Sequence, residues 1–514
     1  MADLTVENVG DAQAYLAEAI RTTDSTPESM LDRFIEIRPG VQRELLAKTN
    51  HLLTGRRGVG KSTLLFRARV SLRAEDIPVV SIDMESFKHR AYPDVLIEIV
   101  LRVLSETTAL VRPAKWWARL SLFRTLRPLF TELNQILGDP LVVQNQVSRE
   151  RSKSRDGSIG GGVEIPADVL KLSMSFKARR VKSAGSAQHG SNELTKDERI
   201  RSLIPQLNMA FRRLIAESSA AHGLIFLDDF YYVAQSDQAM VLDFIHRSVK
   251  GSGFYLKVGG LGTRLQPFKD GDPPIGMQIG HDISRLALDV NLTDFNTAKR
   301  FLEQVVEGIL SPLNVSIASL LTEAARDRMV LASGGAVARD YITLLKGALE
   351  KTIERLSQDG TLVSSDVVRV RTADVQKTMS QLTVMREEDS FQVDALSDAD
   401  ALRERWRDIS RFTKEADTVF ILVPQAVLDD RRIGREINQL EQLRLLHGIR
   451  ETTANSVKWK GRPMVAYMTD LGAAAQQRLR VEIPPFWKNT EESDKLRRAS
   501  WVYSPDLAPP AENP

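Results

Sequence analysis

The chain has 514 residues, of which 42% are hydrophobic and 27% charged, and this length predicts two to four domains. It contains no cysteine, which excludes disulfides, thiol catalysis and cysteine-ligated zinc or iron–sulfur sites. The formal net charge of +3 is too small to indicate a polyanionic partner, so any basic surface is local. No window approaches the roughly 20 apolar residues of a membrane helix, and the N-terminus lacks the pattern of a secretion signal. We therefore expect a cytoplasmic protein without a transmembrane segment.

A short apolar strand from His51 leads into a glycine-rich turn and then into an amphipathic helix that starts near Lys61. The residues from Gly55 to Ser62 match the P-loop pattern, in which main-chain N–H groups surround a phosphate at the positive end of a helix. Lys61 is expected to reach the β- and γ-phosphates, and Ser62 to offer its hydroxyl to Mg²⁺. A glycine-rich turn without a ligand is the alternative, and it leaves both side chains unexplained. The expected nucleotide-binding residues are Gly55, Arg56, Arg57, Gly58, Val59, Gly60, Lys61, Ser62 and Thr63.

The apolar run from Leu224 to Leu227 predicts a buried parallel strand with Asp228 and Asp229 at its carboxyl end, where active sites of open α/β sheets lie. Asp228 is expected to hold Mg²⁺, and Asp229 to orient or deprotonate an attacking water. Because Asp is shorter than Glu, we expect slow hydrolysis, or else that Asp229 is a second residue of the metal sphere. In the alternative interpretation, the pair caps the following helix.

A further buried strand is expected to end at Gly259, followed by a loop with Thr263 and Arg264. The segment Gly259–Pro267 resembles the nucleotide-binding loop of sugar-nucleotide nucleotidyltransferases. In that family the loop lies near the start of its domain, whereas here it follows a P-loop and an acidic strand. We favour a sheet strand whose tip senses the γ-phosphate through Thr263 or Arg264.

Taken in chain order over about residues 30–350, the P-loop, the acidic strand, the sensor strand and the helical stretch after them resemble AAA+ ATPases. The specific likeness is to bacterial origin-recognition-complex-like and STAND members, which implies ATP, Mg²⁺ and a homo-oligomer. It also implies an arginine finger at Arg285, ahead of the expected strand LALDVNL, and a second sensor at Arg339 on a lid helix after Gly334 and Gly335. The alternatives are a solvated residue for Arg285 and a surface salt bridge for Arg339.

Between Met84 and Leu224 the chain is longer than a P-loop core needs, which predicts an insertion at about 110–200. Its first part is a basic amphipathic segment, for which partner contact, membrane surface and core packing compete. Its second part combines clustered Lys and Arg with an alternating run, which indicates either a β-hairpin for DNA or oligomer contact or a solvated loop. The large side chains of the first part are Trp116, Trp117, Phe123 and Phe130.

The C-terminal third resembles a winged helix, with helices followed by two strands and a basic turn that carries Lys458, Lys460 and Arg462. This implies DNA contact, although such modules also bind proteins. The tail 504–514 is expected to lack fixed structure.

The expected fold is therefore α/β: a P-loop AAA+ parallel sheet core with a helical lid, a basic insertion and a C-terminal winged-helix-like domain. The expected divisions are 1–30 (helical extension), 31–291 (ATPase core), 292–395 (lid and linker), 396–490 (winged-helix-like domain) and 491–514 (tail). The expected function is slow Mg-dependent ATP hydrolysis that controls oligomer assembly and DNA or partner engagement, with antiphage defence and a separately encoded effector as implied roles. A nucleotide-gated switch with little turnover, which recruits an effector, is the alternative. The expected catalytic residues are Lys61, Asp228, Asp229, Arg285 and Arg339, and the expected metal ligands are Ser62 and Asp228.

Overall fold

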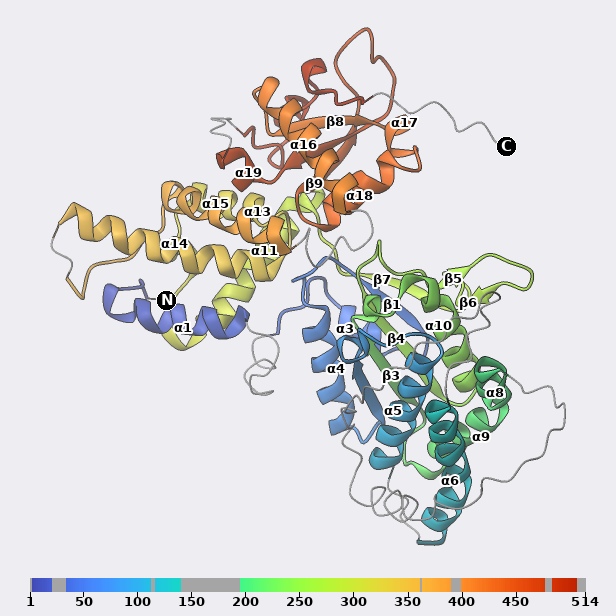
Figure 1. The fold of residues 1–514 in the computed structure, drawn as a ribbon. Coiled ribbons are helices and arrows are strands. Elements are labelled where there is room, and N and C mark those ends of the chain that lie inside the picture. Colours follow the sequence, from blue (N-terminus) through green and yellow to red (C-terminus); the bar gives the residue numbers. More distant parts are fainter. Residues whose placement is uncertain are drawn as a thin grey trace, which may run out of the picture.

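The computed structural model describes residues 2–20, 34–111, 116–139, 195–360, 363–389, 399–476 and 483–505. Figure 1 shows three parts: an α/β core around a parallel sheet, a helical part beside the N-terminal helix, and a C-terminal part with a small sheet of its own. We call the second part the lid (292–389) and the third the C-terminal domain (399–505). Along the described residues, no helix is both long enough and apolar enough to cross a membrane.

The core sheet has five parallel strands in the order β2-β3-β4-β1-β7. Almost all side chains of β1, β3 and β4 are buried on both faces, which explains their near-continuous apolar runs. The register pairs Thr54 with Gly260 and Asp83 with Asp228, so the carboxyl ends of the strands lie along one edge. The strands are β1 (His51–Thr54), β2 (Val79–Asp83), β3 (Gly223–Asp228), β4 (Phe254–Gly260) and β7 (Ser284–Ala287), and a separate hairpin joins β5 (Phe268–Lys269) to β6 (Ile275–Gly276).

Helices cover both faces of this sheet, and alternate strand residues point to the two faces. Leu53 and Phe226 belong to the apolar core that contains α4 and the lid. Leu52 and Ile225 belong to the opposite core, which contains α5, α6, α9 and α10. The core helices are α3 (Val41–Leu46), α4 (Lys61–Ala74), α5 (Asp94–Leu110), α6 (Trp116–Gly138), α8 (Lys196–Ser202), α9 (Ile204–Glu217) and α10 (Gln235–Val249).

The first part of the expected insertion forms α6, which packs against α5 and α9. The buried side chains of α6 recur every three or four residues, as an amphipathic helix requires, whereas Phe123 remains 42% exposed. Core packing is thus the interpretation that the structure supports for this helix. The expected basic hairpin lies outside the described residues. The buried residues of α6 are Leu122, Leu126, Leu129, Leu133 and Ile136.

The lid is a helical bundle onto which the N-terminal segment folds. Helix α1 (Val9–Ile20) lies along α14, and β-bridges pair Ala2 with Val315 and Thr5 with Val367 (Figure 1). Residues 2–20, expected as an extension, are therefore packed as part of the lid. The lid helices are α11 (Phe295–Ile309), α12 (Ile317–Leu320), α13 (Glu323–Ala332), α14 (Ala338–Asp359) and α15 (Thr372–Asp389).

In the C-terminal domain a three-stranded antiparallel sheet has the order β8-β10-β9. The order of elements is helix, strand, two helices and two strands. The helices followed by two strands match the expected order, whereas the strand Phe420–Pro424 before them was not predicted. The loop between the last two strands carries exposed Lys458, Lys460 and Arg462. The elements are α16 (Ala399–Glu415), β8 (Phe420–Pro424), α17 (Gln425–Leu428), α18 (Ile433–Gln442), β9 (Leu446–Thr452), β10 (Met464–Thr469), α19 (Leu471–Gln476) and α20 (Thr490–Asp494).

The expected boundary of this domain at residue 490 is wrong. Trp501 is buried and stacks on Phe420 of β8, and the amide of Tyr503 donates to the carbonyl oxygen of Leu422 at 2.9 Å. The physical reason is that the two aromatic side chains fill the apolar core of the domain, so the folded region continues to residue 505.

Candidate nucleotide site

The P-loop joins β1 to α4 in a tight turn that needs its glycines. Gly58 and Gly60 have φ values of 87° and 95°, in the left-handed region that favours glycine. At Gly55, a Cβ atom would lie 2.8 Å from a methyl group of Val59. Gly60 is the N-cap of α4, so the positive end of that helix faces the loop.

Lys61 is the first residue of α4, and its side chain lies buried inside the loop. Its Nζ donates to the carbonyl oxygens of Gly55 at 2.9 Å and Arg56 at 3.1 Å. Burial lowers the pKa of Lys61, and the charges of Asp229 and Asp228 oppose that shift. The structure therefore brings the lysine and the acidic pair together.

Asp228 is the last residue of β3 and faces the P-loop helix. The hydroxyl of Ser62 is hydrogen-bonded to its carboxylate, while burial raises the pKa of Asp228. On the neighbouring strand, a Cβ at Gly259 would lie 2.9 Å from Oδ1 of Asp228, so this glycine leaves room for the carboxylate. Sequence reasoning placed Gly259 at the end of a strand and at the start of a possible nucleotide-binding loop, and it did not predict this contact with Asp228.

Asp229 occupies the left-handed region with a φ of 51°, which is uncommon for a residue with a side chain. Burial and the neighbouring charge of Asp228 raise the pKa of Asp229 to about 6, against the opposing charge of Lys61. Its side chain makes no cap hydrogen bond to the helical turn Phe230–Tyr232, and α10 begins after Ala234 without a side-chain cap. The alternative in which the acidic pair caps the next helix is therefore wrong.

The oxygen atoms of Ser62 and Asp228 are the hard ligands that Mg²⁺ prefers. The described residues contain no group of three or more His, Asp or Glu that could hold a metal. Ser62 and Asp228 would fit Mg²⁺, which usually takes one or two protein ligands together with phosphate oxygens and water.

The loop after β4 lies beside this edge because β4 sits between β3 and β1. The guanidinium of Arg264 is 6.0 Å from the ring centroid of Tyr231, and its carbonyl oxygen accepts from Gln238 at 3.1 Å. A middle strand at the P-loop edge fits a phosphate sensor. It does not fit the nucleotidyltransferase interpretation, which needs this loop after the first strand of its domain.

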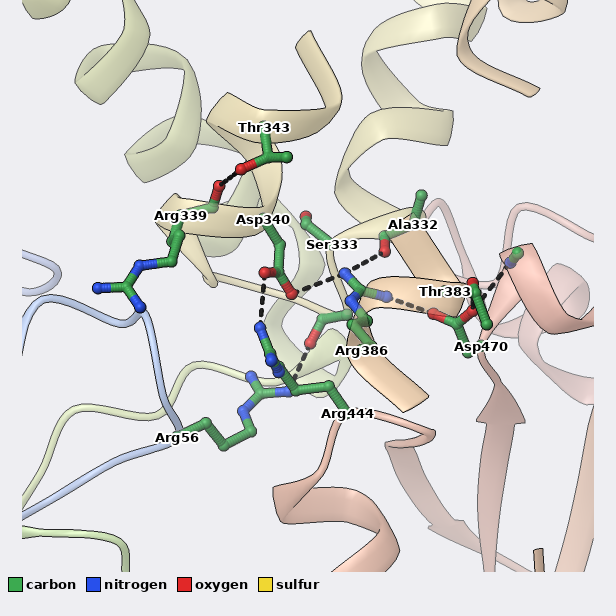
Figure 2. Close-up of polar contacts among 12 residues, drawn as sticks. Arg56, Ala332, Ser333, Arg339, Asp340, Thr343, Thr383, Arg386, Arg444 and Asp470 are labelled. Carbon is green, nitrogen blue, oxygen red and sulfur yellow. Dashed lines mark hydrogen bonds and ion pairs between the residues drawn. The ribbon is translucent and has the colours of Figure 1, made fainter. Parts of the chain in front are cut away.

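Arg339 stands at the start of α14, after a turn in which Gly334 and Gly335 have φ values of 69° and 99°. Its amide donates to the carbonyl oxygen of Gly58 at 3.3 Å, and a Cβ at Gly58 would lie 2.9 Å from Cβ of Arg339. Figure 2 shows its side chain reaching out from α14 on the P-loop side. The structure thus places the lid arginine against the P-loop.

The sequence suggested that Arg285 lies just ahead of a strand. In the structure it is instead the second residue of β7 and lies in register with Leu52. The strand ends at Ala287 because β1 offers only four residues to pair with, after which Asp289 turns toward Arg56. Arg285 is exposed, and its Nη2 lies 3.6 Å from where a Cβ of Gly262 would be.

Sequence reasoning gave Arg56 a role only through the P-loop main chain. In the structure its side chain is 2% exposed and turns away from the loop interior. Its guanidinium pairs with Asp289 at 3.2 Å and donates to the carbonyl oxygen of Gly334 at 2.8 Å. No local pattern could reveal this, because these partners are 233 and 278 residues away.

A scan of protein-family models finds no match to this chain, and a search of curated proteins finds none. Comparison with solved structures matches it to, among others, the Orc1 protein of Aeropyrum pernix in complex with DNA. That match covers 90% of this chain and 95% of the other, at 13% identity and a TM-score of 0.35.

Proposed function

We propose that this chain is an AAA+-type ATPase that binds ATP with Mg²⁺ and hydrolyses it slowly. The observation that carries the proposal is the meeting of Lys61 and Ser62 with Asp228 and Asp229 at the carboxyl edge of a parallel sheet. Main-chain amides of the P-loop would hold the phosphates, and Lys61 would contact the β- and γ-phosphates. Magnesium bound by Ser62 and Asp228 would neutralise charge on the phosphates.

Asp229 is the proposed base that orients or deprotonates the attacking water. Its raised pKa of about 6 suits a carboxylate that must accept a proton near neutral pH. The short side chain supports slow turnover, because an Asp reaches less far than a Glu toward the γ-phosphate. Arg339 is the proposed lid contact to the phosphates.

Arg285 is the proposed arginine finger for a neighbouring copy. It is exposed on β7, the edge strand of the sheet, where a second subunit has access. In this proposal ATP sits at a subunit interface and nucleotide state controls assembly. The resemblance to origin-recognition-like and STAND ATPases is the ground for a role linked to DNA or antiphage defence, beside a separately encoded effector.

The C-terminal domain is the proposed DNA-binding part. The loop between β9 and β10 exposes Lys458, Lys460 and Arg462, and the residues around the start of α18 expose Arg431 and Arg435. Helix α18 and the loop between β9 and β10 (residues 453–463), which we call the wing, together present positive charge that suits the grooves and backbone of a duplex. The basic second part of the insertion is a further proposed contact to DNA or to another subunit.

The test of hydrolysis is phosphate release with Mg²⁺, with a chelator, and in Lys61→Ala. We expect a roughly 100-fold loss in the variant, since it removes a charge that faces the phosphates. Lys48→Ala is the matched control, because Lys48 is exposed on the segment before β1. Equal rates for wild type and Lys61→Ala would remove the P-loop from the chemistry.

A nucleotide-gated switch is the second candidate, and the short Asp229 is the observation that favours it. Protein loaded with radiolabelled ATP and freed of excess nucleotide distinguishes the two. Conversion of the retained ATP to ADP supports the ATPase, whereas retention of intact ATP for hours supports the switch. Neither candidate predicts pyrophosphate release with a sugar phosphate, which the nucleotidyltransferase interpretation requires.

A further inference from the structure

Asp340, the residue after Arg339 on α14, joins the lid to the C-terminal domain. Its carboxylate is buried between two guanidinium groups, at 2.6 Å from Nη1 of Arg444 and 2.7 Å from Nη2 of Arg386 (Figure 2). Arg444 lies in the turn between α18 and β9 of the C-terminal domain, and Arg386 lies on lid helix α15. One carboxylate therefore holds cations from both parts.

Arg386 extends this set of ion pairs to further groups. This guanidinium also pairs with Asp470, which follows β10, and donates to the carbonyl oxygen of Ala332 at the end of α13 at 3.0 Å. Asp470 in turn accepts the amides of Gly472 at 3.0 Å and Ala473 at 3.1 Å in the first turn of α19. The polar chain thus ties three lid helices to the C-terminal domain.

Close packing surrounds this network. A Cβ at Gly472 of α19 would lie 2.3 Å from the carbonyl oxygen of Met379 on α15, so the two helices touch without spare room. A single apolar core contains Leu345 and Val375 of the lid together with Phe420 and Met468 of the C-terminal domain. The lid and the C-terminal domain therefore share one apolar interior, which also reaches Leu53 and Leu64 of the α/β core.

The charges in this interior depend on one another. Burial would raise the pKa of Asp340, but the charges of Arg386 and Arg444 hold it below its ordinary value. Both arginine side chains are less than 10% exposed. Neutralising the carboxylate would leave two buried guanidinium groups without their shared anion, which is far more costly than losing a surface pair.

The turn that leads into Asp340 also touches the P-loop. On one side, Arg56 donates to the carbonyl oxygen of Gly334 and the amide of Arg339 donates to Gly58. On the other side, His447 of the C-terminal domain packs so closely that a Cβ at Gly334 would lie 2.3 Å from its Cε1. The segment from Gly334 to Arg339, which includes the turn and the first residues of α14, thus lies between the P-loop and His447 of the C-terminal domain.

From this geometry we propose that the lid and the C-terminal domain move as one rigid body on the P-loop, with Asp340 as the joint that fixes them to each other. The part of this inference that concerns ATP rests on the proposed function, whereas the joint itself does not. A change at the P-loop is passed through Arg56 and Arg339 to the turn, and from there to the whole C-terminal domain.

The joint is tested without nucleotide, by hydrogen exchange on the full chain. Asp340→Asn is expected to speed exchange both at 443–449 and at the P-loop, 55–61, which it does not contact. The matched control is Asp374→Asn, because Asp374 is a buried carboxylate paired with Arg355 at 3.0 Å inside the lid. The control is expected to leave both segments as in wild type.

If Asp340→Asn speeds exchange at 443–449 and leaves the P-loop unchanged, the proposal is overturned. Arg444→Lys is a milder variant that keeps the charge and replaces the guanidinium whose Nη1 donates to Asp340. This variant replaces Asp340→Asn in the test if Asp340→Asn does not fold. It is expected to speed hydrogen exchange at the same two segments, 443–449 and 55–61.

The rigid-body motion is tested by distances between spin labels. Because the chain has no cysteine, spin labels attach only at pairs of cysteines introduced by substitution. Exposed positions are available on α4 (Arg73), α14 (Glu350) and the wing (Lys460). With Mg·ATP, the 350–460 distance is expected to stay constant, while 73–350 and 73–460 change together.

A change in the 350–460 distance would overturn the proposal, and so would three constant distances in a sample that has bound nucleotide. Binding is measured in the same samples with a fluorescent ATP analogue. A sample that binds none contradicts the proposed function, and the nucleotide-free exchange experiment still decides the joint.

Discussion

The amide of Arg339 donates a hydrogen bond to the carbonyl oxygen of Gly58 at 3.3 Å, which fastens the first turn of lid helix α14 to the P-loop. The two residues are 281 positions apart in the chain, and their Cβ positions would lie 2.9 Å apart if Gly58 carried one. Glycine at 58 is thus needed twice, for its left-handed backbone and for the approach of the lid.

Gly58→Ala is therefore expected to push the lid away from the P-loop and to weaken ATP binding about tenfold, which corresponds to about 1.4 kcal/mol. Titration with a fluorescent ATP analogue measures this. Gly40→Ala is the matched control, because Gly40 has a φ of 85° and nothing within 4 Å of its Cβ position. The control carries the backbone cost alone, about 1 kcal/mol of folding stability. Equal ATP affinities for the two variants would contradict a role for lid contact.

Asp229 is expected to give hydrolysis a dependence on pH. With a pKa of about 6, its carboxylate is ionised in about a tenth of molecules at pH 5 and in most at pH 7, so kcat/KM for ATP should rise about tenfold between them. Phosphate release across this range provides the measurement. Asp229→Asn should bind ATP, turn over poorly and show no such rise, and a flat wild-type profile would argue against Asp229 as the base.

Asp229 is also expected to lower the free energy of unfolding at neutral pH. Its folded pKa of about 6 lies above the ordinary 3.8, so the folded state holds the proton more tightly and stability falls as pH rises from 3.8 to 6. Asp229→Asn should thus stabilise the fold by up to about 3 kcal/mol at pH 7 and by well under about 1 kcal/mol at pH 4. Thermal unfolding at the two pH values checks the sign. Asp76→Asn is the control, because Asp76 is exposed and shares the left-handed backbone with a φ of 56°.

Arg285→Ala is expected to lower kcat roughly a thousandfold while ATP affinity stays unchanged, if the residue completes a neighbour's site. Mixing provides the sharper measurement. A Lys61→Ala subunit has an intact Arg285, so equimolar mixing of the two inactive variants should recover part of the activity. Arg300→Ala, on the exposed side of α11, is the control. A mixture no more active than its components would exclude action between subunits.

Lys458 and Lys460 are expected to contact DNA phosphates. Replacing both by Ala should reduce the slope of log K against log salt by about 1.8, at about 0.9 for each phosphate contact. Fluorescence anisotropy at several salt concentrations provides the slope. Lys346 and Lys351 on α14 form exposed pairs far along the chain from the wing and supply the control double variant. An unchanged slope would exclude the wing from the interface.

The sequence predicted what depends on local pattern and on strand order. Lys61 follows from an eight-residue motif, and Asp228 follows from the rule that carboxyl ends of parallel strands carry the site. The end of β7 could not be predicted, because the length of β1 sets it and not the apolar run after Arg285. Asp340 carries no signal either, since its two arginine partners come from other elements and only tertiary packing brings them together.

Helix α18 spans ten residues, about 15 Å, and its sides meet different surroundings. Arg435 and Asn438 are exposed, whereas Ile437 and Leu440 are buried and the turn that follows reaches Asp340. If α18 contacts DNA as proposed, substitutions on its outer side would change which DNA it prefers while the inner side stays intact. The preference for a DNA target would then be free to change while the contact that ends at Asp340 is kept.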